Sequence, residues 1–302
     1  MGKYVKQFLV ILVIVFAVAR CKKETDHQKE SILKGKVSIL VDETLTPVIE
    51  DQIAVFESEY DANITLISKS EAETVNALMN DSVKIAILSR TLTPEEINAF
   101  DNKKINPRIT PFATDAIALI RNKDNKDILV ALNDVLEFMR GKTILGIKGL
   151  VFDNPNSSTM RYLTELAGLK ASPQQGIFSF HNNNEAIKYV AENDGMIGVV
   201  GLNWIVQPLP EMQPIIKNIS ILNLKGLKSD GYYSPTQNNI AEGKYPLARD
   251  LFIVNCQGFD GLGMGFASFI AGERGQRIIL KSGLLPVRVR GRKIVIRNKI
   301  NK

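Results

Sequence analysis

The chain has 302 residues, of which 45% are hydrophobic and 23% charged, and this is the ordinary composition of a folded globular protein with one large or two medium domains. The formal net charge is +6, and much of the basic excess lies at the two ends of the chain. The body between them lacks the basic surplus of a nucleic-acid-binding protein, so we expect no nucleic-acid partner.

The start of the chain predicts export. Lys3 and Lys6 precede an unbroken apolar run over residues 8–19, which is short for a membrane span and typical of a secretory signal. Cys21 follows the run directly, and the letters VARC resemble a bacterial lipobox except at Arg20, where a small residue is usual. We expect the first 20 residues to be a signal peptide and Cys21 to carry a lipid. The alternative is an uncleaved signal anchor.

A polar, charged stretch over residues 21–34 predicts a flexible tether between lipid and domain. Beyond the tether, strand and helix patterns alternate with short loops, which indicates an α/β architecture with a largely parallel sheet. The expected strands are 36–41, 63–68, 83–90, 143–153, 196–202, 220–226 and 292–298, and the expected helices are 47–60, 70–80, 94–100, 128–141, 158–170 and 184–194, with two more within 265–283.

Helix starts are marked by familiar signals. Thr46 followed by Pro47 predicts an N-cap, and Ser70 with Glu73 forms a capping-box pattern. Thr93 with Glu96 forms the same pattern at the next helix.

Two long strand patterns, 108–122 and 245–256, bracket a self-contained α/β block. A chain that crosses to a second lobe and later returns leaves this signature. We expect lobe 1 to comprise 35–112 plus 246–302 and lobe 2 to comprise 113–245, with a ligand cleft between them.

The sequence argues against an enzyme. It contains two histidines, His27 in the tether and His181 in a loop, and no pattern for a zinc site, a nucleophile elbow or a P-loop. We therefore expect no catalytic residues, no metal and no cofactor.

Hydroxyl-rich loops follow several expected strands, at 42–46, 68–70, 89–91 and 156–159. Loops at the carboxyl ends of strands share one edge of a doubly wound sheet, and helix N-termini attract oxyanions. Taken singly, each loop is explained by helix capping. Ser157, Ser158 and Thr159 together exceed what one cap needs, so they favour a ligand site.

Several stretches, taken together and in order, resemble the periplasmic phosphate-binding proteins of ABC importers, a type II two-lobe class. They cover about 36–290 and read DETLTPVIEDQIAVFESEY, ILSRTLTPEE, FATDAIALIRNKDN, NSSTMRYL, MIGVVGLNWI, YPLARDLFIV and GERGQRIILKSGLLPV. The resemblance implies two lobes, each a mixed, mainly parallel sheet flanked by helices, joined by two crossover strands.

The resemblance also implies a phosphate site. The family's early loop matches Thr44 and Leu45, its next helix-start serine matches Ser70, and its Ser-Gly-Thr triplet matches the residues from 157 to 159. The family's acid after the third strand is Arg90 here, next to Ser89, and its arginine four residues before the triplet is Asp153.

The two departures from the family pattern leave two interpretations open. In one, Arg90 supplies the cation and Asp153 accepts the proton of monohydrogen phosphate. In the other, the two side chains form a structural ion pair beside the site. Asp115 is expected to be structural, at the lobe crossover.

The function this predicts is a monomeric, lipid-anchored periplasmic binding protein that delivers phosphate to the permease of an ABC importer. Its partners are phosphate, the permease subunits and, through the lipid on Cys21, the membrane. Two alternatives remain at this point: a binding module for another tetrahedral oxyanion or for signalling or adhesion without transport, and a periplasmic enzyme acting on phosphoesters.

Overall fold

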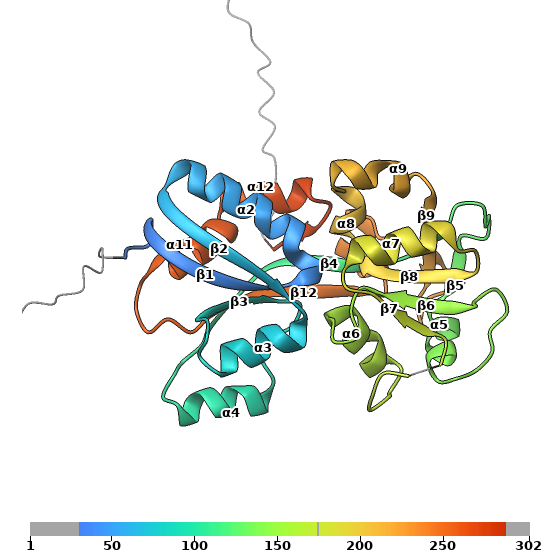
Figure 1. Cartoon of the computed structure of the whole chain (residues 1–302), viewed down its shortest axis with the longest axis horizontal. Helices are drawn as coiled ribbons and strands as arrows, with labels where there is room; N and C mark the ends of the chain where they lie inside the picture. Colours follow the sequence, from blue (N-terminus) through green and yellow to red (C-terminus); the bar gives the residue numbers. More distant parts are fainter. Residues whose placement is uncertain (1–29, 174, 288–302) are drawn as a thin grey trace, which may run out of the picture.

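The computed structural model describes residues 30–173 and 175–287, so the expected signal peptide, Cys21 and the strand expected at 292–298 lie outside the described residues. Strands and helices alternate along the chain and form two lobes that lie side by side (Figure 1). The strands are β1 (Lys34–Asp42), β2 (Asp61–Lys69), β3 (Ile85–Leu88), β4 (Arg108–Asn122), β5 (Leu129–Ala131), β6 (Gly149–Phe152), β7 (Ile177–Ser179), β8 (Met196–Gly201), β9 (Ile219–Ile221), β10 (Asn223–Lys225), β11 (Tyr232–Tyr233), β12 (Ala248–Asn255) and β13 (Leu285–Pro286).

Helices cover both faces of the sheet in each lobe (Figure 1). They are η1 (Glu43–Leu45), α2 (Thr46–Glu59), α3 (Glu71–Met79), α4 (Pro94–Asn102), α5 (Leu132–Met139), α6 (Ser158–Leu166), α7 (Asn183–Glu192), α8 (Asn203–Val206), η2 (Pro210–Met212), α9 (Gln213–Ile216), α10 (Gln237–Ala241), α11 (Leu262–Ile270) and α12 (Glu273–Lys281).

One mixed sheet runs through both lobes, in the order β2-β1-β3-β12-β4-β8-β6-β7. In lobe 1, β1 pairs in parallel with β2 and β3, as expected for strands joined by crossover helices. In lobe 2, β6 pairs in parallel with β7 and β8. The strand β4 joins the halves, because its first part pairs with β12 and its last part with β8.

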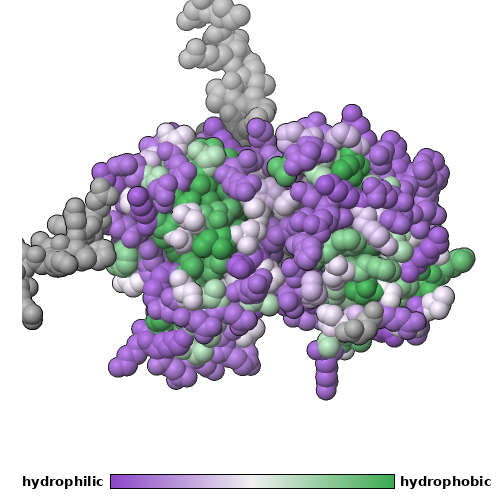
Figure 2. All heavy atoms as spheres, in the orientation of Figure 1, coloured by the Kyte–Doolittle hydropathy of each residue, from purple (hydrophilic) through white to green (hydrophobic). Residues whose placement is uncertain are grey.

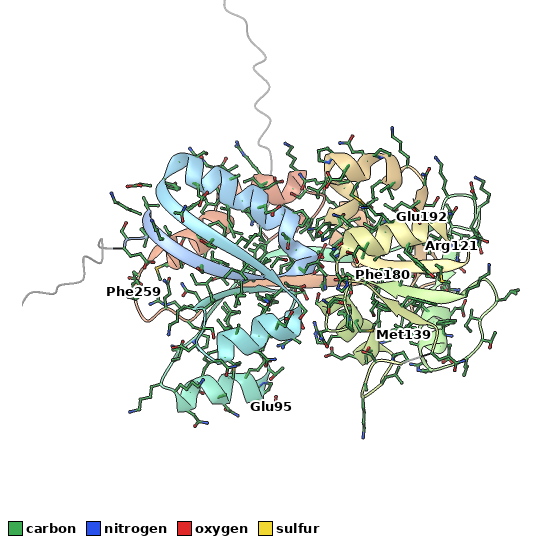
Figure 3. The ribbon with its side chains drawn as sticks, in the orientation of Figure 1. Glu95, Arg121, Met139, Phe180, Glu192 and Phe259 are labelled. Atoms are coloured by element: carbon green, nitrogen blue, oxygen red, sulfur yellow. The ribbon has the colours of Figure 1, made fainter. Side chains whose placement is uncertain are left out.

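The two lobes have separate hydrophobic cores. The lobe 1 core includes the fully buried Phe56, Phe112 and Phe266, and a smaller cluster around Phe100 lies under α3 and α4. The lobe 2 core takes its residues from between 116 and 247, including Met139 of α5, which is labelled in Figure 3. Burying each such large side chain contributes about 1.5–3 kcal/mol. The chain passes from one core to the other near residues 113–116 and again near residues 247–251.

Both predicted capping boxes are confirmed, whereas the predicted N-cap at Thr46 is wrong. Both capping boxes are present, at Ser70 with Glu73 and at Thr93 with Glu96. Thr46 does not cap α2: η1 leads directly into that helix, Leu45 takes the cap position, and the Thr46 hydroxyl lies 2.8 Å from that of Ser68.

The strand expected at 220–226 is two strands in different sheets. β9 pairs with β4, whereas β10 pairs with β5 and β11. The strand expected at 143–153 is confined to β6.

The surface is largely hydrophilic in the view of Figure 2, with a hydrophobic area over β1 and β2. Within residues 30–173 and 175–287, no helix has both the length and the apolar character needed to cross a bilayer.

Candidate functional site

A buried arginine lies where the two crossover strands meet. Arg249 of β12 is only 4% exposed, and it stands directly opposite Asp115 of β4 in the antiparallel register. Its Nη2 lies 3.1 Å from Oδ2 of Asp115, and because both side chains are almost completely buried, each balances the charge of the other. The same guanidinium donates to three hydroxyls, at 3.2 Å to Ser89, 2.6 Å to Ser158 and 3.0 Å to Thr44. One cation therefore connects hydroxyls from both lobes.

The hydroxyls at the start of α6 have separate tasks. Ser157 is the N-cap and accepts from the backbone N–H of Met160 at 3.3 Å. Ser158 instead turns towards lobe 1, with its Oγ 3.2 Å from Oγ1 of Thr44. Thr159 donates to Oδ1 of Asp153 at 2.7 Å. The cap uses one hydroxyl, as expected, and the hydroxyl of Ser158 lies instead beside Thr44 and Arg249.

This arrangement is chemically suited to an oxyanion. The N-terminus of α6 carries the positive end of the helix dipole and backbone N–H groups without intrahelical partners. A guanidinium and several hydroxyls lie beside it, and hydrogen bonds from a charged donor are roughly twice as strong as neutral ones. We call Arg249, Thr44, Ser89 and Ser158 the donor cluster.

Asp42, at the end of β1, adds an acceptor to the donor cluster. It is fully buried, and its Oδ1 accepts from the backbone N–H of Thr44 at 3.2 Å. Its Oδ2 has no hydrogen-bond partner among the residues that the structure describes. Burial raises the pKa of Asp42 to about 6, although the charge of Arg249 opposes the rise. Asp42 can thus accept a hydrogen bond from a protonated ligand.

Arg90 lies outside the donor cluster. Its guanidinium binds both carboxylate oxygens of Glu96 at 2.8 Å and Oε1 of Glu71 at 3.2 Å. Glu71 also accepts from Arg161 at 3.2 Å and from Ser89 at 3.0 Å. Although Glu71 is buried, Arg161 and Arg90 lower its pKa.

Asp153 is bound by Thr159 and Asn183, and Arg90 does not reach it. The two side chains therefore do not form the structural ion pair, and the cation at the crossover is Arg249.

Two other expected residues contribute no side-chain contact to the donor cluster. The Ser70 hydroxyl donates to Glu73 at 2.7 Å and accepts from the Glu73 backbone at 3.3 Å, which is the capping role. Leu45 is fully buried in the lobe 1 core.

Further contacts bring the lobes together around the donor cluster. Asn183 of α7 donates to Glu43 of η1 at 2.7 Å, and the indole of Trp204 donates to the carbonyl of Thr44 at 3.1 Å. On another side, Arg161 of α6 pairs with Glu71 of α3. A groove of about 340 Å³ remains between α3 and α6, and its lining includes Glu71, Ala72, Arg90, Asn156, Ser157 and Arg161.

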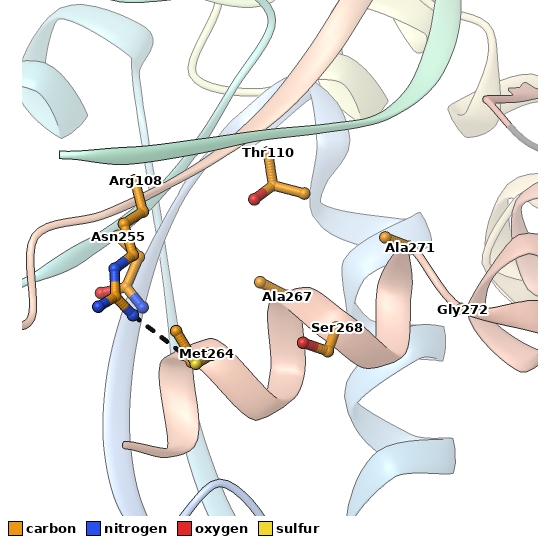
Figure 4. A pocket seen from close by; sticks show the side chains of 8 residues that line it. All are labelled: Arg108, Thr110, Asn255, Met264, Ala267, Ser268, Ala271 and Gly272. Atoms are coloured by element: carbon orange, nitrogen blue, oxygen red, sulfur yellow. Dashed lines mark hydrogen bonds between the residues drawn. The ribbon is translucent and has the colours of Figure 1, made fainter. Parts of the chain in front are cut away.

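A second pocket, of about 410 Å³, lies on lobe 1 against α11 (Figure 4). Arg108 lies at one end of it, donating to Asp260 at 2.9 Å, and small side chains of α11 form its floor. None of the donor-cluster residues lines this pocket. Among the described residues, no group of three or more His, Cys, Asp or Glu side chains is placed to hold a metal ion.

Sequence reasoning did not single out Arg249, although a signal for it was present. Arg249 and Asp115 are charged residues in the middle of the two long, mainly apolar strand patterns. Since an isolated charge is rarely buried, two opposite charges in two buried strands indicate a pair. Asn183 and Glu71 carry no such local signal, because they lie on ordinary amphipathic helices.

The comparisons with known proteins agree with this fold. A family model described as a PBP superfamily domain matches residues 26–274. The phosphate-binding protein PstS of Borreliella burgdorferi is 24% identical over 304 residues, covering 93% of this chain and 99% of that protein. The phosphate-binding protein PstS of Pseudomonas aeruginosa is 22% identical over 290 residues, covering 87% and 86%.

Among solved structures, one described as a phosphate ABC transporter substrate-binding protein from Clostridium perfringens, with bound phosphate, is similar with a TM-score of 0.67. Its sequence identity is 24%, over 84% of this chain and 100% of that chain. At this identity the likeness establishes a shared fold.

Proposed function

Because the chain belongs to the PBP superfamily, we propose that it is a solute-binding protein that captures inorganic phosphate between its lobes and delivers it to an ABC importer. It carries out no covalent chemistry. The names of its relatives, phosphate-binding proteins that align along nearly the whole chain, support this ligand.

The observation that carries the proposal is the donor cluster. Thr44 and Ser89 come from lobe 1, Ser158 comes from lobe 2, and Arg249 lies on a crossover strand. An anion bound by these groups would be held by both lobes at once, so binding would favour closure. Micromolar affinity corresponds to about 8 kcal/mol. Hydrogen bonds to a charged group contribute roughly 1.5–3 kcal/mol each, so a few donors supply this before ordering costs.

The proposed site therefore differs from the one expected from family resemblance. Thr44, Ser89, Ser158 and the N-terminus of α6 remain in it. Arg249 takes the cation's place, and Asp42 accepts the ligand's proton. We assign to Asp153 the positioning of Thr159, to which it is hydrogen-bonded at 2.7 Å.

We also propose that the first 20 residues direct export and that Cys21 carries the lipid anchor, so that a monomeric binding domain works at the periplasmic side of the membrane. The arrangement of charge, apolar run and cysteine supports this. Metabolic labelling with a fatty acid, compared between the natural chain and Cys21→Ser, tests the anchor.

Calorimetry with phosphate, arsenate, sulfate and molybdate tests the ligand. We expect phosphate and arsenate to bind with micromolar or tighter Kd, because both bring a proton for Asp42, and sulfate to bind far more weakly, because it brings none at neutral pH. Tight sulfate binding without phosphate binding would refute the proposal and favour another oxyanion.

A further inference from the structure

A second cluster of acidic groups lies between the lobes, beside the donor cluster. Asn183 Nδ2 donates to Oε2 of Glu43 at 2.7 Å and lies 3.4 Å from Oδ2 of Asp153. Glu43 belongs to η1 of lobe 1, whereas Asp153 follows β6 and Asn183 begins α7, both in lobe 2. One amide group thus faces two carboxyl groups that come from opposite lobes.

The charged groups that act on Glu43 are carboxyl groups. Asp42 at the end of β1 is a third carboxyl group in electrostatic contact with both Glu43 and Asp153. The nearby cations are engaged elsewhere, Arg249 with Asp115 and Arg161 with Glu71. Within the part of the chain that the structure describes, no Lys, Arg or His side chain forms an ion pair with Glu43 or Asp153.

Two neighbouring carboxyl groups without a cation cannot both be ionised at low cost. A proton on one of them turns repulsion into a hydrogen bond to the other. Burial, and then the charge of Asp153 and its hydrogen bond, raise the pKa of Glu43 to about 9, while the backbone N–H of Asn183 works in the opposite direction.

We propose that Glu43 and Asp153 form a proton-dependent latch between the lobes, in which closure requires a proton on Glu43. Closure then takes up a proton and ligand release gives it back. The latch is a property of lobe closure, and it rests on the proposed function only in using phosphate as the ligand that closes the lobes.

The sign of the pH effect follows from the two states of Glu43. The latch requires that opening exposes the Glu43 carboxyl group to water, where its pKa has the ordinary value of 4.5. In the structure, where the lobes are in contact, its pKa is about 9. Below the lower value both states hold the proton and closure is unaffected. Between the two values, the equilibrium constant for closure falls by up to tenfold for each pH unit. Above the higher value, it does not change further with pH.

Glu43→Gln is the decisive variant, because an amide keeps the shape of a protonated carboxyl group and cannot ionise. Glu95→Gln is its matched control, since Glu95 is an exposed residue of α4 in the same lobe (Figure 3). Phosphate Kd is measured by calorimetry from pH 6 to pH 9. The ionisation of phosphate itself affects the natural chain and its variants equally. The Kd of the natural chain divided by the Kd of Glu43→Gln therefore isolates the effect of the latch.

We expect the ratio for Glu43→Gln to rise with pH, towards tenfold per pH unit. The corresponding ratio for the control, the Kd of the natural chain divided by that of Glu95→Gln, should stay constant. Thermal unfolding confirms that each variant folds. Asp153→Asn is the second variant: it removes the neighbouring charge, so the pH dependence should move to lower pH. Parallel pH curves for the natural chain and Glu43→Gln overturn the latch.

Trp204 separates failure of the latch from failure of the proposed function. It is the only tryptophan in the chain, and its indole donates to Thr44 across the lobes, so its emission reports closure. If no phosphate binds at any pH, the proposed function fails. The latch is then tested by the emission of Trp204 in the protein without ligand. A red shift with rising pH in the natural chain but not in Glu43→Gln supports it, and identical emission curves overturn it.

Discussion

Replacing Arg249 by lysine tests the central assignment of the site. Lysine keeps a positive charge beside Asp115, but a single ammonium group cannot reproduce the planar fork that reaches Thr44, Ser89 and Ser158 together. We expect the variant to lose at least two charged hydrogen bonds, either to the ligand or to the hydroxyls of the donor cluster. Each contributes roughly 1.5–3 kcal/mol. Since about 1.4 kcal/mol is a factor of ten, phosphate affinity should fall by about 10² to 10⁴.

Arg90→Lys is the informative comparison. Arg90 is also partly buried and bound to carboxylates, but it contacts Glu71 and Glu96 rather than the donor cluster. We expect its affinity loss to be less than about tenfold, on the scale of one altered ion pair. Both variants are measured by phosphate calorimetry, with denaturant unfolding to confirm the fold. Equal losses in the two variants, or a larger loss in Arg90→Lys, would refute the assignment of Arg249 as the ligand's cation.

Three further outcomes are expected. Ser158→Ala should weaken phosphate binding about tenfold or more in calorimetry, because it removes a buried donor-cluster hydroxyl, and an unchanged Kd would exclude Ser158 from the site. In Asp42, burial raises the pKa from 3.8 to about 6, so its contribution to stability should fall as pH rises through that window. In denaturant unfolding at pH 4 to 7, stability should fall more steeply in the natural chain than in Asp42→Asn, in which Glu43 still titrates. Thr93→Ala should lower unfolding free energy by about 1 kcal/mol through loss of the α4 cap, and a change below experimental error would contradict that role.

In the proposed site, the cation comes from a different part of the chain than the sequence predicted. The sequence pattern suggested that Arg90 and Asp153 exchange roles, with Arg90 as the cation and Asp153 as the acceptor. The structure satisfies Arg90 with Glu71 and Glu96 and satisfies Asp153 with Thr159 and Asn183. Arg249 reaches the same region from the returning crossover strand.

Local features of this protein were determined by the sequence alone. The capping boxes of α3 and α4 depend on residues three apart, and the bounds of β4 match the long strand pattern predicted over 108–122. The surplus of hydroxyls at the start of α6 was visible for the same reason, since a cap needs only one. Such features are governed by contacts within a few residues of the chain, which periodicity and residue type report directly.

The partners of the charged groups were decided only by the tertiary structure. Arg249 and Asp115 are 134 positions apart, and their pairing depends on the register between β12 and β4. Asn183 and Glu43 are 140 positions apart, and they meet only because the two lobes come together. A carboxylate or guanidinium looks the same in any sequence, whereas its burial and its neighbours, which determine its protonation and its role, exist only once the lobes are packed.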